Sequence, residues 1–565
     1  MVANGIPLDI VDWVVNFLSD RNLCLGKSSI RVFNGLPQGS CLSPILFNLY
    51  SASLHRIEDD NTLVFQFAGD FMILSFDRDF EIAVENLSRK ILEFGNDCHS
   101  LNLSFNIRKT KVAYFAKGGR RSVQISVNGC TIEQVSSLTF LGRKIKNSLS
   151  VKEHYDFALG NCNSAVNLLK CLTSIKGGLM PEVSLKFYRS FIRSKIEYAR
   201  TTTAHSPTYI DNRIRSFQNS TLRRCLGLTP STPVHIIYAM ACELPPDLRA
   251  IYLTAKELFR VFVYNPPLFR LIATNRGLNN SYSFVFSKFS HIFDRLGKCV
   301  RSSISVKVTF KLDNPFGCKH NAPRECTRAY YGHLLREYKE NGFRIMATDG
   351  SLSDSSVGCA IVLEHSDRFF LFRCNMRLSS LTAELIAIRE ALVAAATDGF
   401  ERVAILTDSR NAIISLRDSK WEDYIVSEII QIIADSSMRA IHFIWVPSHM
   451  GIPINERADE LARMALDCGA PLQVDYSVKW ALKLIRDELQ DEWNHSYSEI
   501  SQSKGNFYFS FNRTISLKPW YRGFALDPGE VKIINRLLTG HAYDKKFLNL
   551  IRNTTPHFCR STLWK

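Results

Sequence analysis

Four carboxylates between residues 349 and 459 have the types and positions expected of a metal-dependent active site. Asp349 and Asp408 each end a short apolar run, whereas Glu384 and Asp459 each lie near the start of a helical pattern. In a sheet covered by helices, such strand ends and helix starts tend to meet at one edge. Crowded carboxylates repel one another unless cations neutralise them. The sequence therefore predicts two Mg²⁺ or Mn²⁺ ions, which suit phosphodiester hydrolysis.

The elements that must position these carboxylates follow from the hydrophobic pattern of residues 341–470. Apolar segments predict strands, and helical spacing predicts helices, the first of them with Ser380 as a possible N-cap. Three strands followed by β–α alternation predict a mixed five-stranded sheet covered by helices. The predicted strands are 343–350, 358–365, 369–376, 402–409 and 440–449, and the predicted helices are 381–399, 411–418 and 455–466.

Charge separates this block from the rest of the chain. Residues 341–470 contain 12 Lys and Arg against 18 Asp and Glu, whereas the whole 565-residue chain has a net charge of +16. The remaining residues therefore carry the entire positive excess. A basic protein with an acidic α/β block indicates a metal site that acts on a nucleic acid held largely by neighbouring parts. The ordinary hydrophobic content of 46% excludes a disordered chain.

Four strings occur in this block in a fixed order: TDGS, TAEL, LTDSRNA and WVPSHMGIPINERAD. Single acidic residues are usually solvated strand-end or capping residues, but the ordered set resembles type 1 ribonuclease H. The resemblance implies hydrolysis of the RNA strand of an RNA–DNA hybrid. It implies that Asp349, Glu384, Asp408 and Asp459 bind metal, that His449 is a mobile catalytic histidine, and that Ser351, Asn411 and Asn455 contact substrate.

One position departs from this family. Ile454 stands where the family commonly has glycine. If glycine serves a tight turn there, we expect the isoleucine to strain the loop and lower activity.

The first 145 residues carry a second ordered set: NGLPQGSCLSPILFNLY, FAGDFMIL, NLSFNIRKTKVAYF and LTFLGRKI. These strings resemble the reverse transcriptases of non-LTR (LINE-type, jockey-like) retrotransposons. We interpret this part as a polymerase remnant in which the matching positions are Gly35, Pro37, Gln38, Gly39, Asp70 and Lys109.

The polymerase resemblance is incomplete at its metal ligands. Gly69 replaces the first aspartate of the family's YADD hairpin, so only Asp70 remains. The motif with the first catalytic aspartate precedes the GIP string in the family and does not occur in this sequence. Since polymerisation needs carboxylates from separate strands, we expect little or no DNA synthesis.

The patterns together predict an α/β and α multi-domain protein. We expect a truncated reverse-transcriptase palm over 1–145, a helical thumb or connection region over 146–300, a linker over 301–340, a ribonuclease H type 1 domain over 341–472, and a truncated helical tail over 473–565.

The cysteine pattern and the N-terminal sequence indicate the cellular compartment. The 15 cysteines form no C-x-x-C pair, and the N-terminal apolar stretch has no basic n-region. We expect a reduced, intracellular protein in the nucleus or cytoplasm that is neither secreted nor membrane-spanning. The sequence does not determine the oligomeric state. The spacing of Cys318, His320, Cys326 and His333 matches no common zinc finger, and Cys559 stands alone near the end, so no zinc site is predicted.

Three functions compete on this sequence. The first is a hybrid-specific, metal-dependent ribonuclease with RNA–DNA hybrid as its partner. The second is a non-catalytic nucleic-acid-binding remnant, which the basic surroundings favour. The third is an active RNA-directed DNA polymerase, which the missing ligands disfavour.

Overall fold

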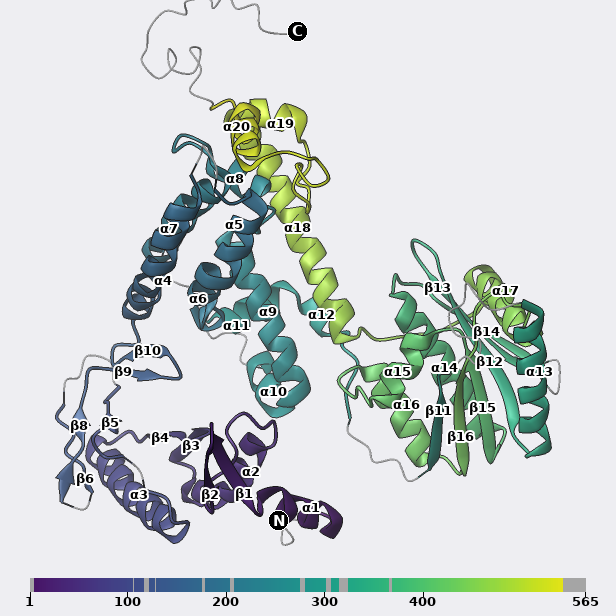
Figure 1. Ribbon diagram of the computed structural model, residues 1–565, viewed down its shortest axis with the longest axis horizontal. Helices are drawn as coiled ribbons and strands as arrows, with labels where there is room; N and C mark the ends of the chain where they lie inside the picture. The colour runs from purple at the N-terminus through teal and green to yellow at the C-terminus, as the bar shows by residue number, and fades with distance from the viewer. Residues whose placement is uncertain are drawn as a thin grey trace, which may run out of the picture. The chain divides into compact units, whose positions relative to one another are not determined.

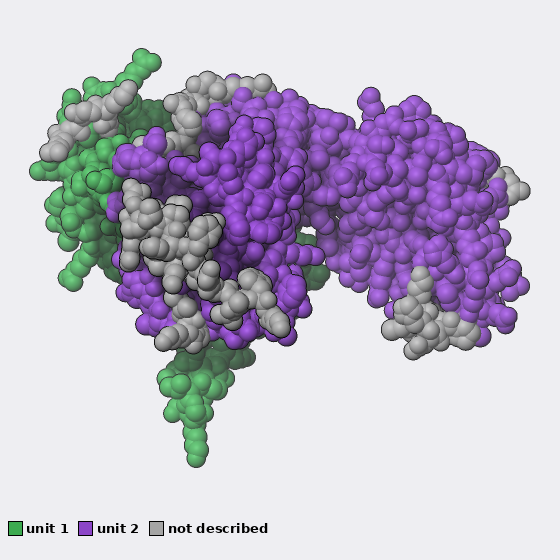
Figure 2. Space-filling model, turned by 90° about the horizontal axis from the view of Figure 1, so that it is seen from above, with its two compact units in different colours: residues 1–157 green, residues 158–565 purple. Residues whose placement is uncertain are grey.

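The computed structural model describes residues 5–104, 106–115, 121–127, 129–174, 178–203, 208–274, 280–300, 306–313, 324–364 and 368–541. The chain divides into two compact units, residues 1–157 and residues 158–565 (Figures 1 and 2). Within the described residues, no helix is long and apolar enough to cross a membrane.

The first unit consists of short paired strands and three helices. One face of the hairpin formed by β3 (Thr62–Phe67) and β4 (Asp70–Ser75) packs on α3 (Phe80–Ser100) and on the short 3₁₀ helix Ala52–Ile57. The α3 helix begins at Asp79, whose carboxylate accepts hydrogen bonds from two backbone amides of the first turn. The elements are α1 (Leu8–Leu18), β1 (Arg21–Leu25), β2 (Ser28–Val32), α2 (Ser43–Tyr50), β3 (Thr62–Phe67), β4 (Asp70–Ser75), α3 (Phe80–Ser100), β5 (Lys111–Val112), β6 (Ser126–Val127), β7 (Cys130–Thr131), β8 (Glu133–Gln134), β9 (Ser137–Phe140) and β10 (Arg143–Lys146).

The second unit contains a helical body, which we define as residues 158–296 together with 478–541. Its elements are α4 (Lys152–Leu172), α5 (Pro181–Phe187), a π-helical turn (Tyr188–Arg193), α6 (Ser194–Glu197), a 3₁₀ turn (Arg200–Thr203), α7 (Thr208–Leu226), α8 (Val234–Ala241), α9 (Pro246–Tyr264), α10 (Pro266–Thr274), α11 (Ser281–Lys288), α12 (Ser290–Phe293), α18 (Val478–Ser503), α19 (Asn506–Phe511) and α20 (Pro528–Thr539).

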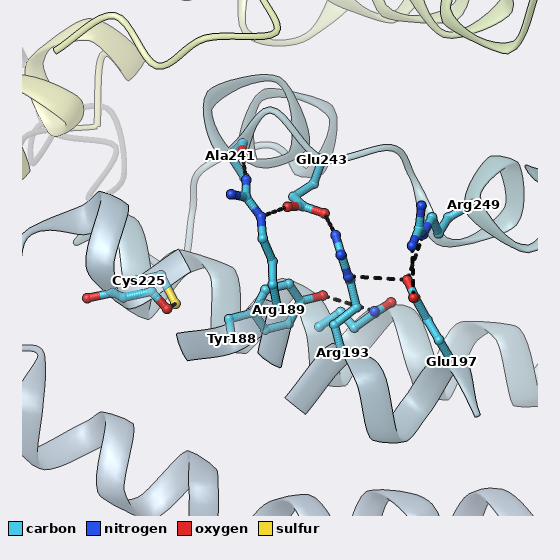
Figure 3. Close-up of polar contacts among 10 residues, drawn as sticks. Tyr188, Arg189, Arg193, Glu197, Cys225, Ala241, Glu243 and Arg249 are labelled. Atoms are coloured by element: carbon cyan, nitrogen blue, oxygen red, sulfur yellow. Dashed lines mark hydrogen bonds and ion pairs between the residues drawn. The ribbon is translucent and has the colours of Figure 1, made fainter. Parts of the chain in front are cut away.

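A buried ion-pair network stabilises the interior of the helical body (Figure 3). The Glu243 carboxylate, whose side chain is only 7% exposed, accepts charged hydrogen bonds from Arg189 and Arg193. Glu197 pairs with Arg193 at 3.3 Å and with Arg249 at 2.8 Å. The buried Glu243 and the partly buried Glu197 therefore each have two guanidinium partners, which offset the cost of desolvation.

The C-terminal helices belong to this body. Lys288 and His291 each lie 2.9 Å from a glutamate of α18. In α20, Asn535 donates a hydrogen bond of 2.9 Å to the carbonyl of Leu226, and the buried Lys532 donates one of 2.7 Å to the carbonyl of Ser174. The structure thus packs much of the predicted tail against the predicted connection region.

The remaining residues, 306–476, form a sheet domain. Its elements are β11 (Lys307–Lys311), α13 (Arg324–Glu340), β12 (Arg344–Leu352), β13 (Val357–Leu363), β14 (Phe369–Cys374), α14 (Ser380–Thr397), β15 (Arg402–Thr407), α15 (Arg410–Arg417), α16 (Tyr424–Asp435), β16 (Ala440–Trp445), α17 (Pro453–Cys468) and β17 (Ala470–Pro471). The strand order is β11-β16-β15-β12-β13-β14-β17. Strands β12, β13 and β14 pair antiparallel, and the other pairs are parallel.

Helices cover both faces of this sheet. The core on one face includes α14 and α16, and the core on the other face includes α13 and α17. The predicted fold class is therefore confirmed: a multi-domain α/β and α protein with a mixed sheet.

The sheet domain differs from the sequence prediction in four details. The sheet has seven strands, not five, because β11 pairs with β16 and β17 pairs with β14. The predicted linker 301–340 contains β11, whose apolar side chains are partly buried in the domain, and α13, which buries Tyr331, Leu334 and Leu335 there. The N-cap of α14 is Ser379, which accepts from the Thr382 amide at 3.1 Å, and not Ser380. Helix α16 was not predicted.

The chain enters and leaves the sheet domain at neighbouring points. Leu296 and Tyr476 form a parallel bridge. The Tyr476 amide donates to the carbonyl of Arg295 at 2.7 Å, and the Gly297 amide donates to the carbonyl of Tyr476 at 3.1 Å. The sheet domain is therefore an insertion within the helical body.

Candidate metal centre

Two neighbouring parallel strands and one helix converge on the metal centre. Asp349 lies near the end of β12, and Asp408 directly follows β15, which pairs with β12 in parallel. Glu384 is in the first turns of α14. Carboxylate oxygens of these three residues all lie within 4.8 Å of one another.

Close approach of α14 to β12 depends on Gly350. A Cβ atom at this position would lie 2.7 Å from the carbonyl carbon of Ala383 and 2.8 Å from the amide nitrogen of Glu384. Real Cβ atoms do not approach backbone so closely, so a side chain here would push α14 away. The TDGS string therefore supplies both a carboxylate and the space for its partner.

Neighbouring groups fix the carboxylates. The Trp445 indole Nε1 donates 2.9 Å to the carbonyl of Asp408, which holds the backbone where β15 ends. The Thr407 hydroxyl donates 3.3 Å to Glu384 Oε2. Sequence reasoning did not single out Thr407 or Trp445, although both lie within the quoted strings.

Electrostatics at this centre favour a bound cation. The pKa of Asp349 is raised to about 7, first by burial and then by the charges of Asp408 and Asp459. The pKa of Glu384 is raised well above its ordinary value by burial, Asp349 and Asp408. A divalent cation would relieve this repulsion, and buried carboxylate oxygens are the ligands that Mg²⁺ and Mn²⁺ prefer. The donor set therefore fits the predicted metal.

The fourth predicted carboxylate, Asp459, stands apart from the three. Its Oδ2 lies 2.5 Å from Arg463 and 3.9 Å from His449 Nδ1. Its charge nevertheless raises the pKa of Asp349, so it lies near the cluster. Gly358 allows α17 to carry Asp459 there, because a Cβ on Gly358 would lie 2.3 Å from the carbonyl oxygen of Ala462.

His449 lies on an exposed loop before α17. The residue has a φ of 59°, and its side chain is 67% exposed. Glu456 holds the loop by accepting a 2.7 Å hydrogen bond from the Gly451 amide, and Arg324 of α13 donates to the same carboxylate at 3.3 Å. Helix α13, which lies before the predicted start of the domain at residue 341, thus supports the loop that carries His449.

The expected strain at Ile454 is not present. Ile454 lies in α17, 7% exposed, in the same buried core as Tyr331 and Leu334 of α13. The left-handed conformations of this loop fall at His449 and Gly451 instead. An isoleucine fits position 454 because the residue lies inside a helix and its side chain is buried in this core.

The predicted substrate contacts occupy three different environments. Ser351 is half-buried on β12, on the same face of the strand as Asp349. Asn411 is exposed in the first turn of α15. Asn455 is buried, and within the described part of the chain its Oδ1 has no hydrogen-bond partner.

A hollow of about 680 Å³ lies where β12 ends and α14 begins, on the two elements that carry Asp349 and Glu384, and we call it hollow 1. Its lining includes the first turn of α14, where the helix dipole favours anions. Two acidic residues also line it, and burial raises the pKa of one of them, Asp423. Its cationic and polar lining includes Arg377, Ser379, Thr382, Lys479 and Lys483. Sequence reasoning missed this hollow because Lys479 and Lys483 come from α18.

The polymerase-like positions lie in the first unit. Gly35 and Gly39 have φ values of 79° and 96°, as tight turns require. The carbonyl of Pro37 accepts from Ser43 Oγ at 2.6 Å. Gln38 follows Pro37 in the same loop. The Lys109 amide donates a hydrogen bond of 3.0 Å to the carbonyl of Asn106, which forms a turn.

Asp70 begins β4 and is exposed, after the turn at Ala68 and Gly69. Within the described ranges, Asp349, Glu384 and Asp408 form the only group of three potential metal ligands, so Asp70 belongs to no such group.

Of the four Cys and His residues considered for zinc, Cys326 and His333 are exposed on α13, whereas Cys318 and His320 lie outside the described residues, as does Cys559.

Comparisons with known proteins agree with this arrangement. Residues 342–467 match the RNase H family, and residues 3–145 match the reverse transcriptase (RNA-dependent DNA polymerase) family. The chain therefore carries a reverse-transcriptase region followed by an RNase H domain.

Curated relatives fall into the same two groups. The RNA-directed DNA polymerase from mobile element jockey of Drosophila melanogaster is 23% identical over 225 residues, which is 38% of this chain and 25% of that protein. This chain therefore spans about a quarter of the length of that relative. A ribonuclease H of Tropheryma whipplei is 43% identical over 98 residues, which is 15% of this chain and 59% of that enzyme.

Solved structures with some likeness are also ribonucleases H. RNase H1 from Halobacterium salinarum is 24% identical with a TM-score of 0.20, and the match covers 22% of this chain and 98% of that one. LC11-RNase H1, solved in complex with an RNA/DNA hybrid, is 19% identical with a TM-score of 0.19, over 22% of this chain and 96% of that one. Such TM-scores add nothing to what the family match shows.

Proposed function

We propose that the sheet domain hydrolyses the RNA strand of RNA–DNA hybrids in a metal-dependent reaction. The observation that carries this proposal is the cluster of Asp349, Glu384 and Asp408 within a segment that matches the RNase H family. The match of residues 342–467 to the RNase H family supports the choice of substrate class.

Four side chains would hold the metal: Asp349, Glu384, Asp408 and Asp459. When bound, Mg²⁺ or Mn²⁺ supplies an activated water and stabilises the leaving oxygen of a phosphodiester. Arg463 and His449 flank Asp459 and orient its carboxylate. The exposed His449 side chain is free to reach solvent, so it is suited to carry a proton to or from the reacting strand.

Charge outside the sheet domain supports a nucleic-acid substrate. Residues 158–300 contain 19 Lys and Arg against 7 Asp and Glu. Hollow 1, on the elements that carry Asp349 and Glu384, is lined by three cationic and two acidic side chains. A duplex held on this basic surface presents its backbone to the acidic centre. Ser351, Asn411 and Asn455 are proposed to contact the strand, where hydroxyls of RNA distinguish it from DNA.

Replacing Asp408 by asparagine tests the proposed reaction. Asp408→Asn removes one metal ligand without changing the shape of the side chain, so cleavage of a labelled hybrid in Mg²⁺ should fall by at least about 100-fold. Asp418→Asn, at the exposed end of α15, is the matched control and should retain full activity. Equal cleavage by Asp408→Asn and the parent protein would exclude this centre.

RNA–RNA and DNA–DNA duplexes complete the experiment. Cleavage of only the RNA strand of the hybrid supports the proposal. Salt-dependent binding without any turnover, by a parent protein shown to be folded, would favour the alternative of a non-catalytic nucleic-acid-binding remnant.

The reverse-transcriptase region is proposed to contribute little DNA synthesis. Gly69 leaves one carboxylate, Asp70, at the hairpin turn where polymerisation requires more than one. Primer extension on an RNA template in Mg²⁺ and in Mn²⁺ measures this directly. Robust incorporation would overturn this part of the proposal.

A further inference from the structure

A second hollow lies at the boundary between the sheet domain and the helical body. It has a volume of about 450 Å³ and we call it hollow 2. Its charged lining consists of Arg295, Arg373 and Asp475, and its remaining polar lining includes Asn375 and Gln473. Arg295 comes from the helical body and lies outside the segment that matches the RNase H family.

Strand register places hollow 2 at the end of the sheet that holds the metal centre. Leu352, which follows Asp349 by three residues, pairs with Val357, and Val357 pairs with Cys374. Cys374 lines hollow 2 and is two strand spacings, about 10 Å, across the sheet from Leu352.

One loop separates the two hollows. Asn375 and Met376 line hollow 2, and the next two residues, Arg377 and Leu378, line hollow 1. Both hollows therefore lie at the same end of the sheet, on either side of this loop. Their cationic side chains are Lys479, Lys483 and Arg377 in hollow 1 and Arg373 and Arg295 in hollow 2.

The two arginines of hollow 2 each use only some of their N–H donors in hydrogen bonds within the described structure. Arg373 Nη1 donates 3.3 Å to the carbonyl of Asp467, but its Nε is buried and lacks a hydrogen-bond partner in the described structure. Arg295 Nη1 donates 3.0 Å to the Tyr476 hydroxyl, and its guanidinium lies 4.5 Å above the Tyr476 ring. A guanidinium has five N–H donors, so each retains donors for a ligand.

We propose that hollow 2 binds a backbone phosphate of the hybrid, beyond the phosphates that lie at the metal centre and hollow 1. Planar guanidinium groups bind phosphate oxygens through paired hydrogen bonds, and the two arginines outweigh the single carboxylate of Asp475. The inference rests on the proposed hybrid substrate. It makes the helical body part of the binding site, because Arg295 comes from that body.

Hybrid length tests this subsite. The double variant Arg295→Gln/Arg373→Gln removes both cations and leaves the backbone hydrogen bond from Tyr476 to the carbonyl of Arg295 in place. With a hybrid of about two helical turns, KM should rise about 10-fold, and the salt dependence of binding should lose about one unit of slope. With a hybrid of about half a turn, which ends before hollow 2, KM should equal that of the parent.

Arg439→Gln is the matched control. Arg439 is exposed and directly precedes β16, at the end of the parallel strands opposite the metal centre, so KM should not change for either hybrid. Thermal unfolding of each variant checks that the fold is retained.

Binding measured without cleavage separates this inference from the proposed function. In an Asp408→Asn background, fluorescence anisotropy with the long hybrid should show the same 10-fold weakening when both arginines are replaced. An equal loss of affinity for long and short hybrids, or no loss for either, would overturn the subsite. Absence of cleavage by the parent chain, together with the length-dependent loss of binding, would overturn only the ribonuclease assignment.

Discussion

Asp349 and Glu384 are buried carboxylates that face each other and a third carboxylate, Asp408. Their positions were predictable because each ends a strand or begins a helix within an ordered string. Their protonation was not predictable, since it depends on burial and on distances set by the glycine at position 350. The pairing of Asp459 with Arg463, four residues later on α17, was also not predicted.

Without metal, the fold should be more stable in mild acid than at neutral pH. Asp349 has a pKa of about 7 in the folded protein against an ordinary value of 3.8, and the pKa of Glu384 is shifted in the same direction. Between these values the folded state binds the extra proton, so its free energy of unfolding falls as the pH rises from about 4 to about 7. Thermal unfolding in EDTA at pH 5 and pH 8 measures this difference.

Adding Mg²⁺ at pH 8 should restore the lost stability, because the cation replaces the proton as the neutralising charge. Asp349→Asn should weaken both the pH dependence and the Mg²⁺ effect. A metal-free protein that unfolds at a higher temperature at pH 8 than at pH 5 would contradict this account of the centre.

At the scale of elements, most strongly patterned strands and helices were predicted. Helix α16 was missed although its apolar residues recur at helical spacing, whereas α13 and β11 are weakly patterned. Helix α13 buries only Thr327, Tyr331, Leu334 and Leu335, and most of its other residues are charged or polar. Strand β11 carries a lysine at each end. Both elements therefore looked like a polar linker. Helix α13 is buried by the sheet it covers and β11 by its pairing with β16, which no local pattern reveals.

The buried position of Ile454, in the core to which α13 and α17 both contribute, changes the expected effect of a substitution there. Ile454→Gly should destabilise the protein by about 2–4 kcal/mol, because it removes a buried side chain and places glycine inside a helix. It should not raise activity, since no strained turn is relieved. Chemical denaturation and the cleavage assay measure the two effects.

Met464→Gly is the control for this substitution. Met464 is half-exposed on the same helix, so its replacement should cost only the helix propensity of about 1 kcal/mol. A glycine at 454 that increased turnover would restore the idea of a strained loop.

At the scale of the whole molecule, the helical body is assembled from two stretches of chain that the sheet domain separates. Sequence patterns indicated helices on both sides but not their association, because contacts such as Asn535 to Leu226 join residues 309 positions apart. The boundaries of the predicted domains otherwise remain predictions.

Asn535 provides a test of this assembly. It is fully buried, donates to the carbonyl of Leu226 at 2.9 Å and accepts from Trp520 Nε1 at 2.9 Å. Asn535→Ala leaves both groups without their partner and should lower the free energy of unfolding by about 1–3 kcal/mol. Ile533→Ala, exposed on the same helix, should change it by less than about 0.5 kcal/mol. Equal effects of the two changes in denaturant titrations would argue against the joined body.

The bridge between Leu296 and Tyr476 has a consequence for how such a chain is built. Because the two ends of the insertion lie side by side, a short turn from 296 to 477 would close the helical body without the nuclease. The host fold could therefore gain or lose this module at a single junction, and loss would uncover Trp480 of α18, which is buried in the core of the sheet domain.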